Sequence, residues 1–231
     1  MNFIEDIRKH FGIILTDDQL LKFQIYFETL IEYNKHTNLT RITDKEEVYY
    51  KHFYDSLTLS SLIYNKDASL CDMGSGAGFP SIPLKIIYPE LKITIIDSLN
   101  KRITFLKELT RKLELDNINL IHSRIEDYGV KNNLKFDYVT ARALGNLTLI
   151  SEMALPMLKV KGRFLAMKGS NVADELKAAT NTLKILNGKI INEMTLELPN
   201  DFGTRNIIII EKEKHTKGYP RKYSLMTKNP L

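Results

Sequence analysis

The chain has 231 residues, of which 43% are hydrophobic and 26% charged, an ordinary composition for one globular domain with an appendage or for two small domains. No apolar run approaches the roughly 20 residues of a membrane helix, and the N-terminus lacks a signal-peptide core, so we expect neither a membrane nor a secreted protein. The single cysteine, Cys71, fits a reducing compartment, which favours a cytoplasmic location. The net charge is +5, and residues 214–231 carry basic but no acidic side chains.

The first 65 residues are predicted to be helical. Thr16 and Gln19 have the spacing of a capping box, and apolar residues return every three or four positions after them. Thr43 and Glu46 repeat this spacing and predict a second helix start.

From Ser69 onward, short apolar strands alternate with helical patterns, which is typical of a doubly wound α/β fold with a parallel sheet. The predicted strands are Leu70–Met73, Ile93–Asp97, Asn119–His122, Phe136–Ala141 and Arg163–Lys168. The predicted helices are Ile82–Tyr88, Lys101–Leu115, Leu147–Leu158 and Val172–Leu186.

The end of the sheet is expected to differ from the rest. Two further strand-like runs, Lys189–Leu198 and Arg205–Glu211, are separated by a gap too short for a crossover helix, so they must pair antiparallel. This arrangement favours a class I methyltransferase fold, Rossmann-like, over a nicotinamide-dependent dehydrogenase. We expect an N-terminal helical subdomain (1–65), a Rossmann-like domain (66–213) and a basic C-terminal tail (214–231).

The loop after the first strand predicts a nucleoside pocket. Gly74, Gly76 and Gly78 allow a sharp turn with no Cβ in the way, and the next strand ends on Asp97, where a carboxylate can accept both ribose hydroxyls. A dinucleotide fingerprint requires a glycine at the sixth position from Gly74, which here is Phe79. The loop therefore suits a nucleoside without phosphates.

Several further motifs together make the chain resemble the glucose-inhibited division protein B family. They are Asn34-x-x-x-Asn38-Leu39-Thr40, His52-x-x-Asp55-Ser56-Leu57, Asp72 to Pro83, Asp97-Ser98-x-x-Lys101-Arg102, Arg124-x-Glu126, Phe136-Asp137 with Ala141-Arg142-Ala143, Lys168-Gly169, Arg205 and Tyr219-Pro220-Arg221-Lys222. Ser81 and Ser224 depart from the family pattern, which has glycine at or near these positions.

The resemblance implies an enzyme that uses S-adenosylmethionine to methylate N7 of a guanine in 16S ribosomal RNA, free or in a small ribosomal subunit particle. It implies that the cofactor is bound by residues of the loop and of the following strand ends. These are Asp72, Gly74, Ser75, Gly76, Phe79, Asp97, Ile125, Glu126 and Arg142. Asp97 and Glu126 also follow predicted strand ends, which a doubly wound sheet places at its ligand edge. Asp72 could instead order the loop, and Arg142 could form a structural salt bridge.

The chemistry requires few protein groups. Guanine N7 has no proton to remove, so no general base is needed, and we assign no catalytic residue. The chain lacks an Asn/Asp-Pro-Pro-Tyr/Phe motif and a Pro-Cys nucleophile, which favours a ring-nitrogen or ribose target. No histidine has ligand spacing with a cysteine or an acid, so no metal site is expected.

Basic side chains near the same edge are candidates for RNA binding. They are Arg124, Lys168 and Arg205, together with Arg221 and Lys222 in the tail. Salt bridges or surface solubility are the alternative for each of them. Two other functions stay open at this point: a small-molecule methyltransferase, and a non-catalytic RNA-binding factor in ribosome assembly.

Overall fold

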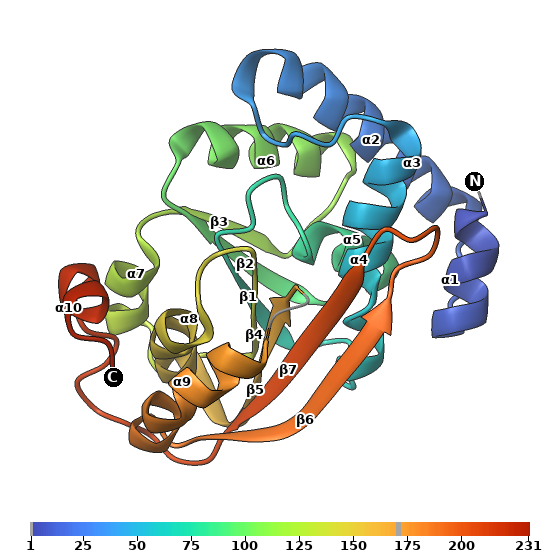
Figure 1. The fold of residues 1–231 in the computed structure, drawn as a ribbon. Helices are drawn as coiled ribbons and strands as arrows, with labels where there is room; N and C mark the ends of the chain where they lie inside the picture. The colour runs from blue at the N-terminus through green and yellow to red at the C-terminus, as the bar shows by residue number, and fades with distance from the viewer. Residues whose placement is uncertain (1, 170–171) are drawn as a thin grey trace.

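The chain forms one mixed sheet, flanked by helices on both faces (Figure 1). A computed structural model describes residues 2–169 and 172–231. The seven-stranded sheet has the order β3-β2-β1-β4-β5-β7-β6, in which only the pairs made by β7 are antiparallel. The strands are β1 (Ser69–Met73), β2 (Lys92–Asp97), β3 (Ile118–His122), β4 (Phe136–Arg142), β5 (Leu158–Lys168), β6 (Gly188–Glu197) and β7 (Thr204–Lys212).

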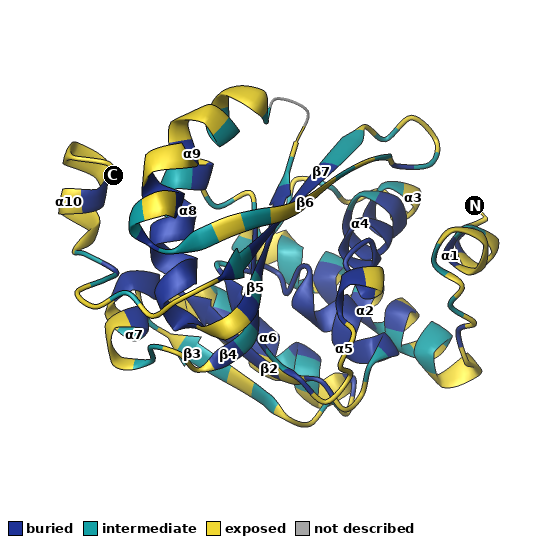
Figure 2. Ribbon diagram, turned by 90° about the horizontal axis from the view of Figure 1, so that it is seen from below, coloured by how far each residue is buried: buried dark blue, intermediate teal, exposed yellow. Residues whose placement is uncertain are grey.

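The helices form two layers, which lie on opposite sides of the sheet in Figure 2. The first layer contains α1 (Phe3–Phe11), α2 (Asp17–Thr37), α3 (Lys45–Val48), a π-helical turn (Tyr49–Tyr54), α4 (Asp55–Leu57), a 3₁₀ turn (Ser60–Leu62), α5 (Ser81–Ile87) and α6 (Asn100–Lys112). The second contains α7 (Ile125–Lys131), α8 (Leu147–Ala154), a 3₁₀ turn (Leu155–Met157), α9 (Ala173–Ile185) and α10 (Tyr223–Lys228).

Each layer encloses its own hydrophobic core, because successive strand residues point to opposite faces of a sheet. In β7, Ile207 and Ile209 pack into the core beneath the N-terminal helices, whereas Ile208 and Ile210 pack into the core beneath α8 and α9. All four side chains are buried. Burial on both faces explains why this strand has no polar alternation in the sequence.

The predicted fold class is confirmed, and so is the antiparallel pairing of the last two strands. The capping box of Thr16 and Gln19 is present at the start of α2. The second predicted helix start is wrong: Asp44, not Thr43, accepts the hydrogen bond from the backbone N–H of Glu47. A carboxylate one position later caps the helix equally well.

Two helices were not predicted. They are α7, which connects β3 to β4, and α10 in the basic tail. Both have seven residues or fewer, too few for a helical period to stand out. Among the described residues, no helix is both long and apolar enough to cross a membrane.

Candidate active site

The loop after β1 is shaped by glycines with positive φ. Gly74 has a φ of 66° and Gly78 a φ of 100°. A Cβ on Gly74 would lie 2.7 Å from Leu144 Cδ1, and one on Gly78 would lie 2.7 Å from Ile82 Cγ1. The backbone N–H of Gly74 donates to the carbonyl of Ile96 at 2.8 Å, which joins the loop to the end of β2. The loop is therefore held tightly against its neighbours.

Aromatic side chains of the first helical layer support this loop. The buried Tyr26 hydroxyl donates to the Ala77 carbonyl at 2.6 Å, and its ring stacks on Phe79 with centroids 5.3 Å apart. The ring of His52 also stacks on Phe79, at 4.4 Å. Phe79 is only 3% exposed. The N-terminal helices are thus part of the framework of the site.

Asp97 ends β2 beside the loop. One of its carboxylate oxygens, Oδ2, lies 3.3 Å from the Gly76 backbone nitrogen and 3.2 Å from Arg102 Nη1, while Oδ1 accepts from the Leu99 N–H at 2.9 Å. A hollow of about 200 Å³ opens here, which we term the Asp97 hollow. It is lined by Gly74, Asp97, Ser98, Arg102, Arg124, Ile125, Glu126, Leu144, Leu149, Met153 and Tyr223.

The far wall of the Asp97 hollow comes from the start of α7. Glu126 is 6% exposed, and its Oε1 accepts from Arg124 Nε at 2.5 Å. Arg124 in turn lies over the ring of Tyr223, with 4.9 Å between its guanidinium carbon and the ring centroid. Ile125, which lies between Arg124 and Glu126 in the sequence, contributes apolar surface to the same wall. The hollow therefore combines carboxylates with apolar and aromatic surface.

A second hollow, of about 210 Å³, lies next to the first, and we term it the His52 hollow. It shares Gly74, Arg102 and Leu144 with the Asp97 hollow. Its lining also includes Leu39, Thr40, His52, Ser75, Gly76, Ala77, Phe79, Arg142 and Ala143. The glycine loop therefore borders an elongated binding region whose two halves differ in chemistry.

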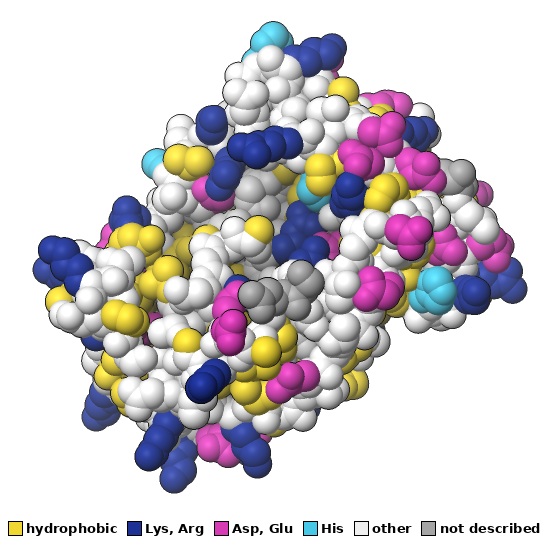
Figure 3. Space-filling view, viewed as in Figure 1, with side chains coloured by type: hydrophobic (Ala, Val, Ile, Leu, Met, Phe, Trp, Pro, Cys, Tyr) yellow, Lys and Arg dark blue, Asp and Glu magenta, His cyan; other side chains and the backbone are white. Residues whose placement is uncertain are grey.

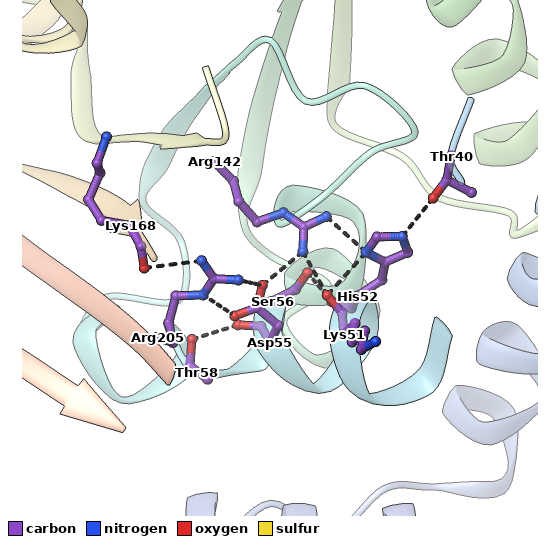
Figure 4. Close-up of polar contacts among 9 residues, drawn as sticks. All are labelled: Thr40, Lys51, His52, Asp55, Ser56, Thr58, Arg142, Lys168 and Arg205. Atoms are coloured by element: carbon purple, nitrogen blue, oxygen red, sulfur yellow. Dashed lines mark hydrogen bonds and ion pairs between the residues drawn. The ribbon is translucent and has the colours of Figure 1, made fainter. Parts of the chain in front are cut away.

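A buried carboxylate organises the floor of this region (Figure 4). Asp55, in α4, has no exposed surface. Arg142 Nη1 donates to its Oδ2 at 2.8 Å, and Arg205 donates from Nε and Nη2 to its two oxygens at 2.5 and 2.7 Å. Two guanidiniums share one carboxylate, so the cluster keeps a net positive charge. The group joins the first helical layer to the ends of β4 and β7.

His52 lies between this cluster and the glycine loop. Its Nδ1 is 3.2 Å from Arg142 Nη2 and 3.1 Å from the Lys51 carbonyl, and its Nε2 is 3.0 Å from Thr40 Oγ1. Burial, together with the nearby positive charge of Arg142, lowers the pKa of His52 to about 3. At neutral pH the imidazole is therefore uncharged.

Asp72 lies behind the loop and does not line either hollow. It is completely buried, and its Oδ2 accepts from the Ser81 N–H at 3.2 Å. Its Oδ1 has no hydrogen-bond partner among the described residues. Burial raises the pKa of Asp72 to about 7, and the hydrogen bond from the Ser81 N–H opposes this rise. The structure thus brings Asp72 to the start of α5, whereas Gly74, Ser75, Gly76, Phe79, Asp97, Ile125, Glu126 and Arg142 line the binding region.

Most of the basic residues considered for RNA binding are paired with carboxylates. Arg124 pairs with Glu126, Lys168 with Glu175, Arg205 with Asp55, and Arg221 with Glu152. Lys222 is exposed. The face onto which the loop opens carries Lys and Arg side chains in and beside its central hollow (Figure 3). Among the described residues, no group of His, Cys, Asp and Glu side chains is arranged to hold a metal ion.

Residues 19–208 match the model of the family GidB, described as rRNA small subunit methyltransferase G. A protein of that name from Ligilactobacillus salivarius is 49% identical over 95% of this chain and 94% of its own length. Another, from Acholeplasma laidlawii, is 49% identical over 95% of this chain and 96% of its own. The chain belongs to the rRNA small subunit methyltransferase G family. The resemblance expected from the sequence motifs is confirmed.

Solved structures of other proteins share the fold of this chain. TYW2 of M. jannaschii, in complex with AdoMet, aligns with a TM-score of 0.57 at 15% identity, over 74% of this chain and 77% of its own. A SAM-dependent methyltransferase from Aquifex aeolicus aligns with a TM-score of 0.54 at 14% identity, over 76% and 97%. The rRNA small subunit methyltransferase G family is S-adenosylmethionine-dependent, as predicted, and this chain has the fold that such enzymes use.

The structure adds residues of the binding region to which sequence reasoning gave no role. Thr40, His52 and Asp55 stood in motifs of the methyltransferase G family, but the contact of Thr40 with His52 and those of His52 and Asp55 with Arg142 could not be inferred from spacing. One signal was available, since an acid in the apolar run Phe53-Tyr54-Asp55-Ser56-Leu57 is expected only where it is paired. Tyr26 and Arg102 gave no comparable signal.

Proposed function

We propose that this protein transfers a methyl group from S-adenosylmethionine to N7 of a guanine in 16S ribosomal RNA. The proposal rests on family membership and on one structural observation: the Asp97 hollow and the His52 hollow meet at the glycine loop. The Asp97 hollow has carboxylates suited to a nucleoside. The His52 hollow has the positively charged Asp55 cluster beside it and the uncharged imidazole of His52 in its wall. Such a region can hold a cofactor and a target base on either side of one loop.

The residues present fit the cofactor. Asp97 offers carboxylate oxygens for ribose hydroxyls, and Glu126 with Ile125 offers a polar and apolar wall for the adenine. Gly74, Ser75, Gly76 and Phe79 border the loop side, and the buried Ser75 hydroxyl has no partner among the described residues. A buried hydroxyl without a partner is costly, and a polar ligand would satisfy it. Asp72 supports this surface from behind through Ser81.

The protein's contribution to the reaction is position and charge. The cofactor supplies an activated methyl group on a sulfonium. The guanine N7 lone pair needs no deprotonation, so the uncharged His52 is not required as a base, and its stacking on Phe79 shapes the wall instead. Arg142 and Arg205 share the one carboxylate of Asp55, so the cluster keeps a net positive charge beside the His52 hollow. A guanidinium donates well to guanine O6, the neighbour of N7, so Arg142 would orient the base. Orientation alone can supply roughly 7–11 kcal/mol.

The RNA would approach across the face with the central hollow, in and beside which Lys and Arg side chains lie (Figure 3). Lys222 is the one predicted contact that is exposed with no carboxylate partner among the described residues. Arg124, Lys168 and Arg221 would act mainly by holding the surface in shape, because each is paired with a carboxylate of its own, whereas Arg205 shares Asp55 with Arg142. The substrate is 16S ribosomal RNA, free or in a small ribosomal subunit particle.

Methyl incorporation tests this function. The protein is incubated with labelled S-adenosylmethionine and unmodified small-subunit RNA or particles, and the modified base is identified by mass spectrometry. A single N7-methylguanine is expected. Transfer to another atom, or transfer only to small molecules, would refute the proposal, and cofactor binding without any transfer would favour a binding factor in ribosome assembly.

Two variants test the assigned roles. Asp97→Ala should weaken S-adenosylmethionine binding in calorimetry while the fold survives, and unchanged affinity would remove the ribose assignment. Arg142→Lys keeps a charge near Asp55 but loses the planar fork, so methylation should fall while cofactor binding changes less. Full activity of Arg142→Lys would show that only the charge is required.

A further inference from the structure

The C-terminal segment, residues 219–231, is attached firmly to the second helical layer. Arg221 donates from Nε and Nη2 to the two oxygens of Glu152, both at 2.7 Å, and Glu152 in α8 is 1% exposed. Met226 is buried in the core beneath α8. The carbonyl of the last residue, Leu231, accepts from Thr182 Oγ1 at 3.0 Å. The basic tail is therefore a folded part of the molecule, and α10 packs against α8 (Figure 2).

This attachment places an aromatic ring at the mouth of the cofactor region. Tyr223, the first residue of α10, lines the Asp97 hollow together with Ile125 and Glu126. Its side chain is 40% exposed, and its hydroxyl makes no hydrogen bond within the described ranges. An exposed aromatic ring whose hydroxyl makes no hydrogen bond can stack on a planar ligand, since every purine offers a π-face.

Arg124 fixes the position of that ring. Its guanidinium lies 4.9 Å from the Tyr223 ring centroid while its Nε donates to Glu126. Glu126, Arg124 and Tyr223 thus contact one another in series, from the buried carboxylate to the exposed ring. Because Arg124 already has a carboxylate and an aromatic partner, its geometry suits a wall better than a phosphate contact.

We propose that Tyr223, held by the folded C-terminal segment and by Arg124, forms the outer wall of the adenine subsite. The segment would thus belong to the cofactor site, and its tyrosine would contact the purine of the bound nucleoside. This inference rests on the cofactor assignment made above and is independent of which RNA atom is methylated.

The test is calorimetry without RNA, using S-adenosylhomocysteine and methylthioadenosine as probes. Tyr223→Ala should weaken both about tenfold, because both contain the adenosine group and stacking on an aromatic contributes on the order of 1–3 kcal/mol. Tyr223→Phe, which keeps the ring, should bind like the wild type. Lys222→Ala is the matched control, because this neighbour is exposed and does not line the hollow, and it should leave both affinities unchanged.

Other outcomes would overturn the inference. Unchanged affinity of Tyr223→Ala for both probes, with a raised KM for RNA, would assign the ring to an RNA base. A loss for S-adenosylhomocysteine but not for methylthioadenosine would place it at the amino-acid end of the cofactor. If Tyr223→Ala proves unfolded in circular dichroism, Tyr223→Leu keeps apolar bulk without a π-face and decides the same question. Failure of the wild type to bind either probe would refute the cofactor assignment itself, and the inference with it.

Discussion

The two ends of the chain are attached to opposite faces of the same sheet, and a buried carboxylate is central to each attachment. On one face Asp55 binds two guanidiniums, Arg142 and Arg205, which come from β4 and β7. On the other, Glu152 binds one guanidinium, Arg221, from the C-terminal segment. The Arg221 side chain is 22% exposed, more than the 13% and 17% of Arg142 and Arg205.

The difference shows what each attachment can do. A buried ion pair adds little net stability compared with apolar packing, but removing one partner is costly because a charge stays buried alone. The Asp55 cluster connects three elements and borders the site, so its loss should affect both fold and chemistry. The Glu152 pair connects one peripheral segment and should affect that segment first.

Removal of Asp55 is expected to have the largest effect. In Asp55→Ala two buried guanidiniums lose their shared carboxylate, and the free energy of unfolding should fall by about 3–5 kcal/mol. Urea denaturation measures this change. Asp67→Ala is the matched control, because the ion pair of Asp67 with Lys92 is exposed and its loss should change the stability little. Similar losses in the two variants would contradict the special role of the cluster.

Removal of Arg221 should have a smaller and more local effect. Arg221→Ala leaves Glu152 buried without its guanidinium, and a loss of about 2 kcal/mol is expected because this pair is more exposed. The C-terminal segment should also become accessible to trypsin at Lys222 and Lys228 before the rest of the protein unfolds. A digestion pattern like that of the wild type would show that Met226 and the chain end hold the segment without the ion pair.

Asp72 is a third buried carboxylate, and unlike Asp55 and Glu152 it has no arginine among its hydrogen-bonding partners within the described residues. With a pKa of about 7 in the folded protein and 3.8 as the ordinary value, the folded state holds the proton more tightly than the unfolded chain. The contribution of Asp72 to the free energy of unfolding is therefore fully present below about pH 4, and it is lost as the pH rises towards 7. Asp72→Asn cannot titrate, so its advantage over the wild type should grow by up to about 1.4 kcal/mol per pH unit in this window.

Urea denaturation of both proteins at several pH values between 4 and 8 checks the Asp72 prediction. The two stability curves should diverge up to about pH 7 and run parallel above it. Curves that stay parallel throughout would show that Asp72 is ionised in the folded protein across the whole range.

The smallest effect is expected where the first helical layer meets the glycine loop. Tyr26→Phe removes the hydroxyl that donates to the Ala77 carbonyl, and the loss should be about 1 kcal/mol in urea denaturation. Tyr64→Phe is the control, since the Tyr64 side chain is 69% exposed. Equal stability of Tyr26→Phe and the wild type would mean that water replaces the hydroxyl at this carbonyl.

Much of the fold could be predicted from the sequence because the signals are local. Apolar strands alternate with helical periods, and the short gap before Thr204 dictates an antiparallel pair. The same holds for Asp97, whose position after a strand places it at the ligand edge of the sheet. The short helices α7 and α10 were not predicted, because their seven and six residues contain too little periodicity.

The partners of the charged residues could not be predicted, because a salt bridge between distant segments has no local signature. Arg205 was interpreted as a candidate RNA contact from its place at a strand start, and its partner Asp55 comes from the first helical layer. Tyr223 was assigned to the tail, and only the tertiary structure brings it to the Asp97 hollow. In each case the sequence predicted the residue's position along the chain but not the surface that it meets.

The long separation between Asp55 and its partners sets an order of events for the nascent chain. Arg142 follows Asp55 by 87 positions and Arg205 by 150, and ribosomes add about 5–20 residues per second. The carboxylate can therefore reach Arg142 seconds before Arg205 has been synthesised. The site gains its second guanidinium only when β7, the last strand to be made, inserts between β5 and β6.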